Sequence, residues 1–389
     1  MSPSVYRLNP GLARLDGRLP GDRPFLSSHD VYQSMPKAHP TVFVGMSGGV
    51  DSSVAAALLK QQGYEVVGVF MKNWSEDVPG GFCNAEADFA DVRAVCQHLD
   101  IPYYTFNFEA EYKQRVLSYF FSEYKAGRTP NPDVMCNKEI KFELFLKKAL
   151  SLGADYIATG HYAQKVEKDG RHQMLKGNDP IKDQTYFLYN LTQAQLSKTL
   201  FPVGKYPKKQ VRALAKKFKL PTATKKDSQG ICFIGPVDVR EFLKTVLKVK
   251  PGQIVDQEGK VLGRHEGAWF YTIGQRRVEG LAGQPEPLYV VSTDIQRNLV
   301  VVGPDSATYA KGVILDKLHL VDPQSKPSNR LEAKPRYGPD IYPGQLHQKN
   351  RQWQFIFDTP QRALTPGQSL VIYDKKICLG GGVIQSVIK

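Results

Sequence analysis

The chain has 389 residues, of which 41% are hydrophobic and 23% charged, and its net charge at pH 7 is +14. This length exceeds what one hydrophobic core usually organises, so we expect two or three domains, and no apolar run approaches a membrane span. Five cysteines spread through so long a chain do not form a secreted disulfide scaffold. We therefore expect an intracellular, soluble protein with a polyanionic partner.

Residues 1–40 hold six prolines, scattered charge and little periodicity, which is typical of a flexible extension. Asp16, Asp22 and Asp30 argue against an organelle transit peptide, because such peptides are poor in acidic residues. We expect a disordered tail or an upstream start, with targeting as the alternative, and a cytoplasmic location.

From Thr41 onward, strand-like runs alternate with helical patterns. The strands are expected at 41–46, 65–71, 103–108 and 155–159, and the helices near 52–62, 84–99, 110–126 and 137–150. This alternation predicts an α/β fold with a doubly wound parallel sheet. Ligands bind such sheets beyond the carboxyl ends of the strands.

A Gly- and Ser-rich string, SGGVDSS (47–53), links the first expected strand to the first expected helix. Its two glycines let backbone N–H groups approach an anion, and the helix start adds its positive dipole end. The string matches neither the P-loop nor the dinucleotide fingerprint. It resembles the pyrophosphate-binding loop of enzymes that cleave ATP between the α and β phosphates; the alternative is a plain turn.

Two cysteines lie in loop-like contexts that suit reactivity. Cys136 precedes a helical pattern, and we expect it near a helix N-terminus, where the dipole lowers a thiol pKa. Cys232 lies in a stretch with glycines on both sides. Burial as a small hydrophobe is the alternative for each. Cys83, Cys96 and Cys378 receive no catalytic role.

The densest positive charge lies in residues 198–226, which contain ten Lys or Arg residues and no Asp or Glu. Backbone phosphates of a nucleic acid would be drawn to such a patch. Because Val211, Leu214, Ala215 and Phe218 recur at helical spacing, the alternative is an amphipathic helix with a solvated face.

After about residue 250 the pattern changes to short alternating runs punctuated by Gly and Pro. Examples are 288–292, 299–302, 353–357 and 369–373. They predict small β-domains or barrels, and a break near 305–312 divides the region in two.

Six motifs occur in one order along the chain: SGGVDSS, FMKNW (70–74), GRTPNPDVMCNKEIKF (127–142), ATGHYA (158–163), KDQTYFLY (182–189) and DSQGICFIG (227–235). Together they resemble the tRNA-specific 2-thiouridylases of the PP-loop ATP pyrophosphatase superfamily over roughly residues 41–389. The resemblance implies a PP-loop catalytic domain at 41–235, a central β-domain at 236–308 and a tRNA-binding C-terminal β-barrel at 309–389.

The implied activity is insertion of sulfur at C2 of the wobble uridine, position 34, in tRNAs for Lys, Glu and Gln. ATP, with Mg²⁺, would be cleaved to AMP and pyrophosphate. By resemblance Cys232 carries a persulfide supplied by a sulfur-relay protein or cysteine desulfurase, and Cys136 is the second nucleophile. Transfer leaves a Cys136–Cys232 disulfide, and Asp133 is the candidate acid/base.

The resemblance also implies binding residues. Those for the nucleotide are Gly45, Met46, Ser47, Gly48, Gly49, Val50, Asp51, Ser52, Met71 and Gly160. Those for the tRNA are Asn131, Pro132, Asp133, His161, Lys182, Asp183, Gln184, Arg336, Tyr337 and Gln368. The metal ligands are not assigned. Departures from the family pattern are the Pro-rich leader and the tract at 75–81.

Three other functions compete with this one. A 4-thiouridine or lysidine synthetase would share the ATP loop, although the two cysteines argue against lysidine chemistry. A small-molecule adenylating ligase would not need the basic stretch. A non-catalytic RNA-binding protein would release no pyrophosphate.

Overall fold

The computed structural model describes residues 39–77, 85–227, 232, 234, 237–281, 286–328 and 330–389. The expectations for the leader up to residue 38, for Cys83 and for most of the 75–81 and 227–235 tracts lie outside these residues. The described chain belongs to one compact unit, His39–Lys389.

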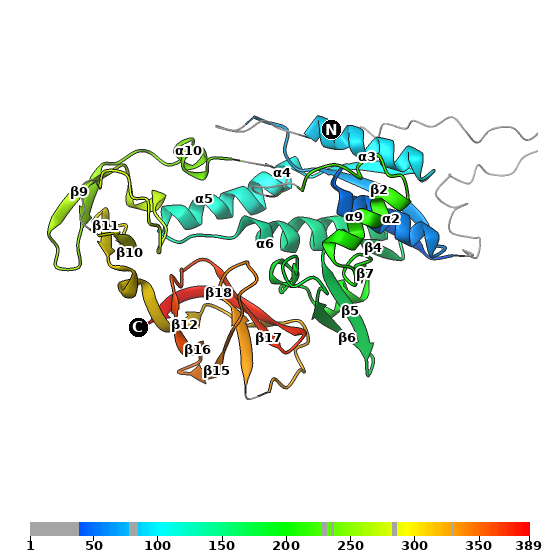
Figure 1. Ribbon diagram of the computed structural model, residues 1–389. Coiled ribbons are helices and arrows are strands. Elements are labelled where there is room, and N and C mark those ends of the chain that lie inside the picture. Colours follow the sequence, from blue (N-terminus) through cyan, green and yellow to red (C-terminus); the bar gives the residue numbers. More distant parts are fainter. Residues whose placement is uncertain are drawn as a thin grey trace, which may run out of the picture. The chain divides into compact units, whose positions relative to one another are not determined.

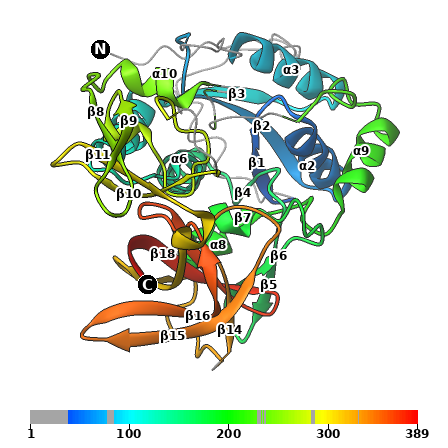
Figure 2. The same ribbon diagram turned by 60° about the vertical axis from the view of Figure 1, so that its left-hand side comes forward.

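Five parallel strands form the first sheet, in the order β3-β2-β1-β4-β7 (Figure 1 and Figure 2). Their bounds are β1 Thr41–Met46, β2 Glu65–Lys72, β3 Tyr103–Asn107, β4 Tyr156–Ala158 and β7 Thr199–Leu200. The strand order reverses between β1 and β4, which is where doubly wound folds bind ligands.

The two faces of this sheet are covered by different helices, because successive side chains of β1 point to opposite faces. Val42 and Val44 pack with apolar residues of α2 (Val50–Gln61), α3 (Ala85–His98) and α9 (Lys208–Lys217). Phe43 instead packs with the cluster that contains Cys136 and Phe145. The predicted doubly wound α/β fold is confirmed.

Two long helical runs cover that second face and contact one another. The first comprises α4 (Glu109–Tyr112), η1 (Lys113–Leu117) and α5 (Ser118–Lys125), and the second α6 (Pro132–Cys136), η2 (Asn137–Phe145) and α7 (Leu146–Ser151). η1 and η2 are π-helical. The predicted start at 137 is wrong: Asn131 caps the helix by accepting a 3.1 Å bond from the Val134 N–H, and Pro132 occupies its first turn.

A four-stranded sheet, in the order β10-β11-β8-β9, follows the short helix α10 (Val239–Lys244). Its strands are β8 Gly252–Val255, β9 Val261–His265, β10 Tyr289–Asp294 and β11 Leu299–Gly303. Short 3-10 turns are η3 Thr185–Phe187, η4 Ala268–Phe270 and η5 Asp305–Thr308, and α8 spans Gln193–Ser197.

The C-terminal strands close into a six-stranded barrel, because β12 pairs with both β16 and β18 (Figure 2). The strands are β12 Tyr309–Leu315, β14 Leu331–Lys334, β15 Tyr342–Lys349, β16 Gln352–Arg362, β17 Ser369–Asp374 and β18 Ile377–Ile388. β13 (His319–Leu320) also pairs with β18. The predicted C-terminal barrel is confirmed, whereas the exact domain boundaries stay a prediction.

An unpredicted hairpin joins this barrel to the first half of the chain. It consists of β5 (Ala163–Lys168) and β6 (Arg171–Lys176), and β6 pairs with β18 where Leu175 meets Ile377. Among the described residues, no helix combines the length and apolar character needed to cross a membrane.

Candidate active site

The loop after β1 is a cradle for an anion. Gly48 has φ +71°, and a Cβ there would lie 2.7 Å from the Asp88 carbonyl oxygen. Gly49 is the N-cap residue of α2, and no side chain accepts a hydrogen bond from the first backbone N–H groups of this helix. These N–H groups are therefore available to a ligand. The hydroxyls of Ser47 and Ser52 lie 3.2 Å apart beside these groups. The loop therefore fits the pyrophosphate part of ATP.

The other predicted nucleotide residues border this loop. A Cβ on Gly160, just beyond β4, would lie 2.6 Å from the Ser52 nitrogen, so only glycine allows this approach. Gly45 lies against Met71 of β2, since a Cβ there would meet the Met71 methyl at 3.1 Å. The predicted set thus gathers at the carboxyl edge of β1, β2 and β4; Met46 ends β1, and Val50, Asp51 and Ser52 form the first turn of α2.

A network of ion pairs links the loop to the chain that leads to Cys232. Lys208 bonds both Asp51 and Asp227, at 2.7 and 2.8 Å, and Asp227 also pairs with Lys182 and Arg212. Burial opposes ionisation of Asp227, but the bonds from Lys182 and Lys208 lower its pKa to about 2. The carboxylate therefore stays charged at neutral pH.

Cys136 and Cys232, 96 residues apart in the chain, bring their sulfur atoms within 3.9 Å of each other. Cys136 is buried inside the helical run, one turn beyond Pro132, so its expected place at the end of a loop is wrong. Asp133 accepts a 2.9 Å bond from the Cys232 backbone N–H. The hydroxyl of Tyr112 donates to the Cys232 carbonyl at 2.7 Å.

The two thiols differ in acidity. Burial raises the pKa of Cys136 well above its usual value, and this reverses the lowering expected from a helix start. The hydrogen bond from Cys136 lowers the pKa of Cys232, against the effect of burial and with help from Lys141. Burial also raises the pKa of Asp133. Cys232 is therefore the thiol that ionises first.

Lys141 and Tyr112 were missed in the sequence analysis. Lys141 lies on η2 and hydrogen bonds to Cys232; burial tends to lower its pKa, but Cys232, Cys136 and Asp133 raise it overall. Lys141 stands within the KEIK part of the motif, whereas nothing in the sequence pairs Tyr112 with residue 232.

The loop that precedes α6 is held by the barrel. The Gln368 amide donates to the carbonyls of Thr129 and Pro130 at 2.9 and 3.1 Å, and the Thr129 N–H donates to Pro366 at 2.9 Å. A Cβ on Gly367 would lie 2.8 Å from Thr129. Gln368 thus contacts protein groups next to Asn131.

Two predicted tRNA residues are interior. His161 is buried, bonds the Thr159 hydroxyl at 2.8 Å and has its pKa lowered well below the usual range by burial. Asp183 is 2% exposed and forms a 3.1 Å ion pair with the equally buried Lys334. As they lie, both side chains support the loops from within instead of presenting a surface to RNA.

The remaining predicted tRNA residues lie nearer to solvent. Tyr337 is 40% exposed and packs on Phe187 with ring centroids 4.4 Å apart. Arg336 donates to the Arg362 carbonyl and is exposed. The Gln184 side chain accepts from the Tyr162 N–H at 3.0 Å.

The basic stretch 198–226 divides into two groups. Lys208, Arg212 and Lys225 form ion pairs with acidic residues from other segments. The exposed lysines are Lys198, Lys205, Lys209, Lys216, Lys217, Lys219 and Lys226. Only the second group remains available to phosphates.

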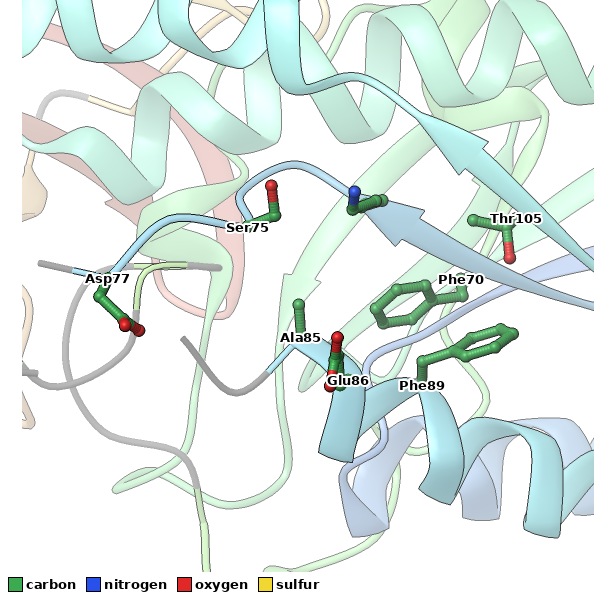
Figure 3. Close-up of a pocket in the computed structure, with 8 residues that line it drawn as sticks. Phe70, Ser75, Asp77, Ala85, Glu86, Phe89 and Thr105 are labelled. Atoms are coloured by element: carbon green, nitrogen blue, oxygen red, sulfur yellow. The ribbon is translucent and has the colours of Figure 1, made fainter. Parts of the chain in front are cut away.

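A hollow of about 440 Å³ lies beside α3, between the ends of β2 and β3 (Figure 3). Phe70 and Phe89, with ring centroids 5.3 Å apart, line it together with Glu86 and Thr105. Neither Cys136 nor Cys232 lines this hollow, so the hollow alone does not identify the position of the reacting groups.

Asn73, in the FMKNW motif, is 1% exposed, and its amide nitrogen and oxygen have no hydrogen-bond partner in the described part of the chain. A buried amide without partners costs about 1–3 kcal/mol per group. Because it follows β2, this amide lies at the ligand-binding edge of the sheet, where a bound base could satisfy it.

Three family models match nearly the whole described chain. They are the tRNA methyl transferase HUP domain at 40–236, the tRNA methyl transferase PRC-barrel domain at 240–304 and the aminomethyltransferase beta-barrel domain at 310–384.

Curated relatives are similar over almost their full length. The tRNA-specific 2-thiouridylase MnmA of Alkaliphilus oremlandii is 52% identical over 355 residues, covering 90% of this chain and 98% of the relative. Those of Shouchella clausii and Stutzerimonas stutzeri are 51% and 50% identical, covering 89% and 88% of this chain and 96% and 94% of the relatives. With this identity, and with a thiol pair and an anion-binding loop in one matched domain, the chain belongs to the tRNA-specific 2-thiouridylase family.

Proposed function

We propose that this protein is a tRNA 2-thiouridine synthase, a sulfurtransferase that uses ATP to replace the C2 oxygen of the wobble uridine with sulfur. The observation that carries the proposal is the contact between Cys136 and Cys232, 3.9 Å apart, beside the half-buried Asp133 carboxyl group. An anion-binding loop alone would serve many adenylating enzymes, whereas two thiols in contact suit sulfur transfer.

The first step activates the base. A C2 oxygen is a poor leaving group, so it attacks the α-phosphorus of ATP, and pyrophosphate departs toward the first N–H groups of α2. The adenylated ring has lost its N3 proton, which we assign to Asp133, because its raised pKa suits proton exchange nearer neutral pH. Met71 and Gly160 flank the nucleotide.

The second step transfers sulfur. The Cys232 persulfide attacks C2 through its terminal sulfur, AMP leaves with the former C2 oxygen, and the base is joined to Cys232 through an S–S bond. Cys136, which its raised pKa keeps protonated until this point, then attacks the Cys232 sulfur and passes its thiol proton to the departing base. That S–S bond breaks, the thiolated base departs with the electron pair, and a Cys136–Cys232 disulfide remains. An external thiol reductant resets the pair.

The substrates are the tRNAs for Lys, Glu and Gln. Displacing the wobble base from the anticodon stack costs roughly a few kcal/mol, which contacts along the tRNA must offset. Asn131 and Pro132 stand next to the thiol pair for base contacts, Arg336 and Tyr337 offer pairing and stacking, and Lys182 and Gln184 lie in the neighbouring segment. The seven exposed lysines of the 198–226 stretch supply attraction for phosphates.

The proposal also covers the sulfur donor, the cellular location and the metal ion. The persulfide comes from a sulfur-relay protein or cysteine desulfurase, and the protein works in the cytoplasm. Mg²⁺ would be held mainly by the ATP phosphates and would neutralise their charge.

The test is mass spectrometry of tRNA after incubation with the protein, ATP, Mg²⁺ and a sulfur donor. We expect 2-thiouridine at the wobble position together with AMP and pyrophosphate. Without reductant, Cys232→Ser and Cys136→Ser should release no thiolated tRNA and should leave tRNA affinity nearly unchanged, while Cys96→Ala, at a buried thiol of high pKa, serves as the control.

Other outcomes point to other functions. Thiouridine at a different ring or chain position would indicate another tRNA thiolase. Absence of tRNA binding at moderate salt would favour a small-molecule ligase, and binding without pyrophosphate release would favour a non-catalytic RNA-binding protein.

A further inference from the structure

The thiol pair lies in a cluster of ionisable groups that includes one lysine. Cys136 and Asp133 come from α6, Lys141 from η2, Tyr112 from α4, and Cys232 from its own segment. Among the groups that the described residues bring to this cluster, Lys141 alone carries a positive charge at neutral pH. His161, which also lies near Lys141, is buried, and its pKa is lowered well below the usual range.

The backbone explains how Lys141 reaches the sulfur. It lies five residues after Cys136, and η2 is a π-helix, in which hydrogen bonds run from residue i to i+5. A π-helical turn holds more residues than an α-helical one, so Lys141 lies nearer to the side of the helix that carries Cys136. In an α-helix of 3.6 residues per turn, Lys141 would lie about 140° around the axis from Cys136. π-Helical turns occur frequently at functional sites.

The groups around Cys232 disfavour its thiolate unless a positive charge lies close to the sulfur. Asp133 lies against the Cys232 backbone at 2.9 Å, and Tyr112 and Cys136 are both buried nearby. A thiolate formed beside a carboxylate in a desolvated site is strongly disfavoured unless an opposite charge is close. Lys141 hydrogen bonds to Cys232 and carries that charge.

We propose that Lys141 is a further catalytic residue, whose ammonium group pairs with the Cys232 sulfur and holds it as the thiolate that accepts sulfur. In this step the thiolate attacks the terminal sulfur of a donor persulfide, the donor S–S bond breaks, and the electron pair leaves on the donor thiolate. Lys141 keeps its proton throughout. The inference rests on the proposed function for the identity of the donor, but the state of the thiol can be measured without it.

The experiment measures the rate at which iodoacetamide alkylates Cys232 as a function of pH, with each cysteine peptide quantified by mass spectrometry. Neither tRNA nor ATP is present. We expect Lys141→Gln to slow alkylation of Cys232 about tenfold at pH 7, because the pKa of Cys232 rises when the ammonium group is removed. Lys141→Arg, which keeps the charge, should retain most of the wild-type profile. Lys138→Met removes an exposed lysine, paired with Glu139, from the same helix and should change nothing.

A Lys141→Gln profile that superimposes on wild type would overturn the proposal, and so would a slowed Lys141→Arg with an intact fold by circular dichroism. If Lys141→Gln does not fold, the pH dependence of Cys232 alkylation is compared between Lys141→Arg and Lys141→Met instead. A protein that shows the expected profile yet makes no 2-thiouridine would refute the proposed function and leave the role of Lys141 intact.

Discussion

Each turnover should end with a disulfide between Cys136 and Cys232. When reductant is withheld, this disulfide should accumulate and can be measured. The sulfur atoms lie 3.9 Å apart, and a bonded pair lies about 2.05 Å apart, so they need to approach by ~1.9 Å. The bond would close a loop between residues 96 apart in the chain, which in the chain-entropy model stabilises a protein by about 4–5 kcal/mol before strain is subtracted.

The assay uses persulfide-loaded protein with tRNA and ATP but no reductant. We expect one 2-thiouridine per protein molecule, after which the reaction stops and the denatured chain titrates three free thiols, two fewer than its five cysteines. Adding a thiol reductant should restore turnover. Cys136→Ser should instead stall with tRNA attached to Cys232 through an S–S bond that reductant releases.

Repeated turnover without reductant would refute this reasoning. A thiol count that stays at five after one turnover would do the same, because the electrons that release the thiolated base must then come from elsewhere.

Further predictions concern the loop, the ion pairs, the barrel contact and the basic surface. Gly48→Ala should weaken ATP binding at least tenfold, since its Cβ would lie 2.7 Å from the Asp88 carbonyl; isothermal titration with ATP checks this, and unchanged affinity contradicts it. Asp227→Asn should lower the melting temperature at pH 7. The pKa of Asp227 is lowered to about 2 in the folded protein, against about 3.9 in the unfolded chain. Its ion pairs therefore stabilise the fold fully above pH ~3.9, and this contribution is lost as pH falls toward 2. A difference in melting temperature between variant and wild type that persists below pH 2 would contradict this cause. Gln368→Ala should lower kcat more than it changes tRNA affinity, because it removes two hydrogen bonds of about 1 kcal/mol each from the loop before α6; steady-state kinetics would reveal the opposite pattern if Gln368 serves only to bind tRNA. Replacing Lys216 and Lys217 with Glu should reduce the slope of log Kd against log salt by about two, and an unchanged slope would remove α9 from the RNA-binding surface.

The parallel sheet and its loop could be predicted because their signals are local. Apolar runs set the strands, and Gly48 and Gly49 mark the turn between β1 and α2. The helix start at Pro132 was also readable, because Asn131 followed by Pro is a capping signal, yet the stretch was interpreted as a loop.

Other features depend on pairings that no local pattern contains. The attachment of the hairpin β5–β6 to the barrel depends on the pairing of Leu175 with Ile377. The exposed fraction of the basic stretch depends on distant acidic residues such as Asp51 and Asp88. The approach of Lys141 to Cys232 follows from π-helical geometry, which the apolar periodicity does not indicate.

The central claim is that ATP converts the C2 oxygen into a leaving group before the thiol pair replaces it with sulfur. The most direct measurement uses tRNA labelled with ¹⁸O at C2 of the wobble uridine, followed by mass spectrometry of the released nucleotide. The proposed reaction places one ¹⁸O atom in the phosphate of AMP for each 2-thiouridine formed. Label recovered in water or pyrophosphate, with unlabelled AMP, would contradict it.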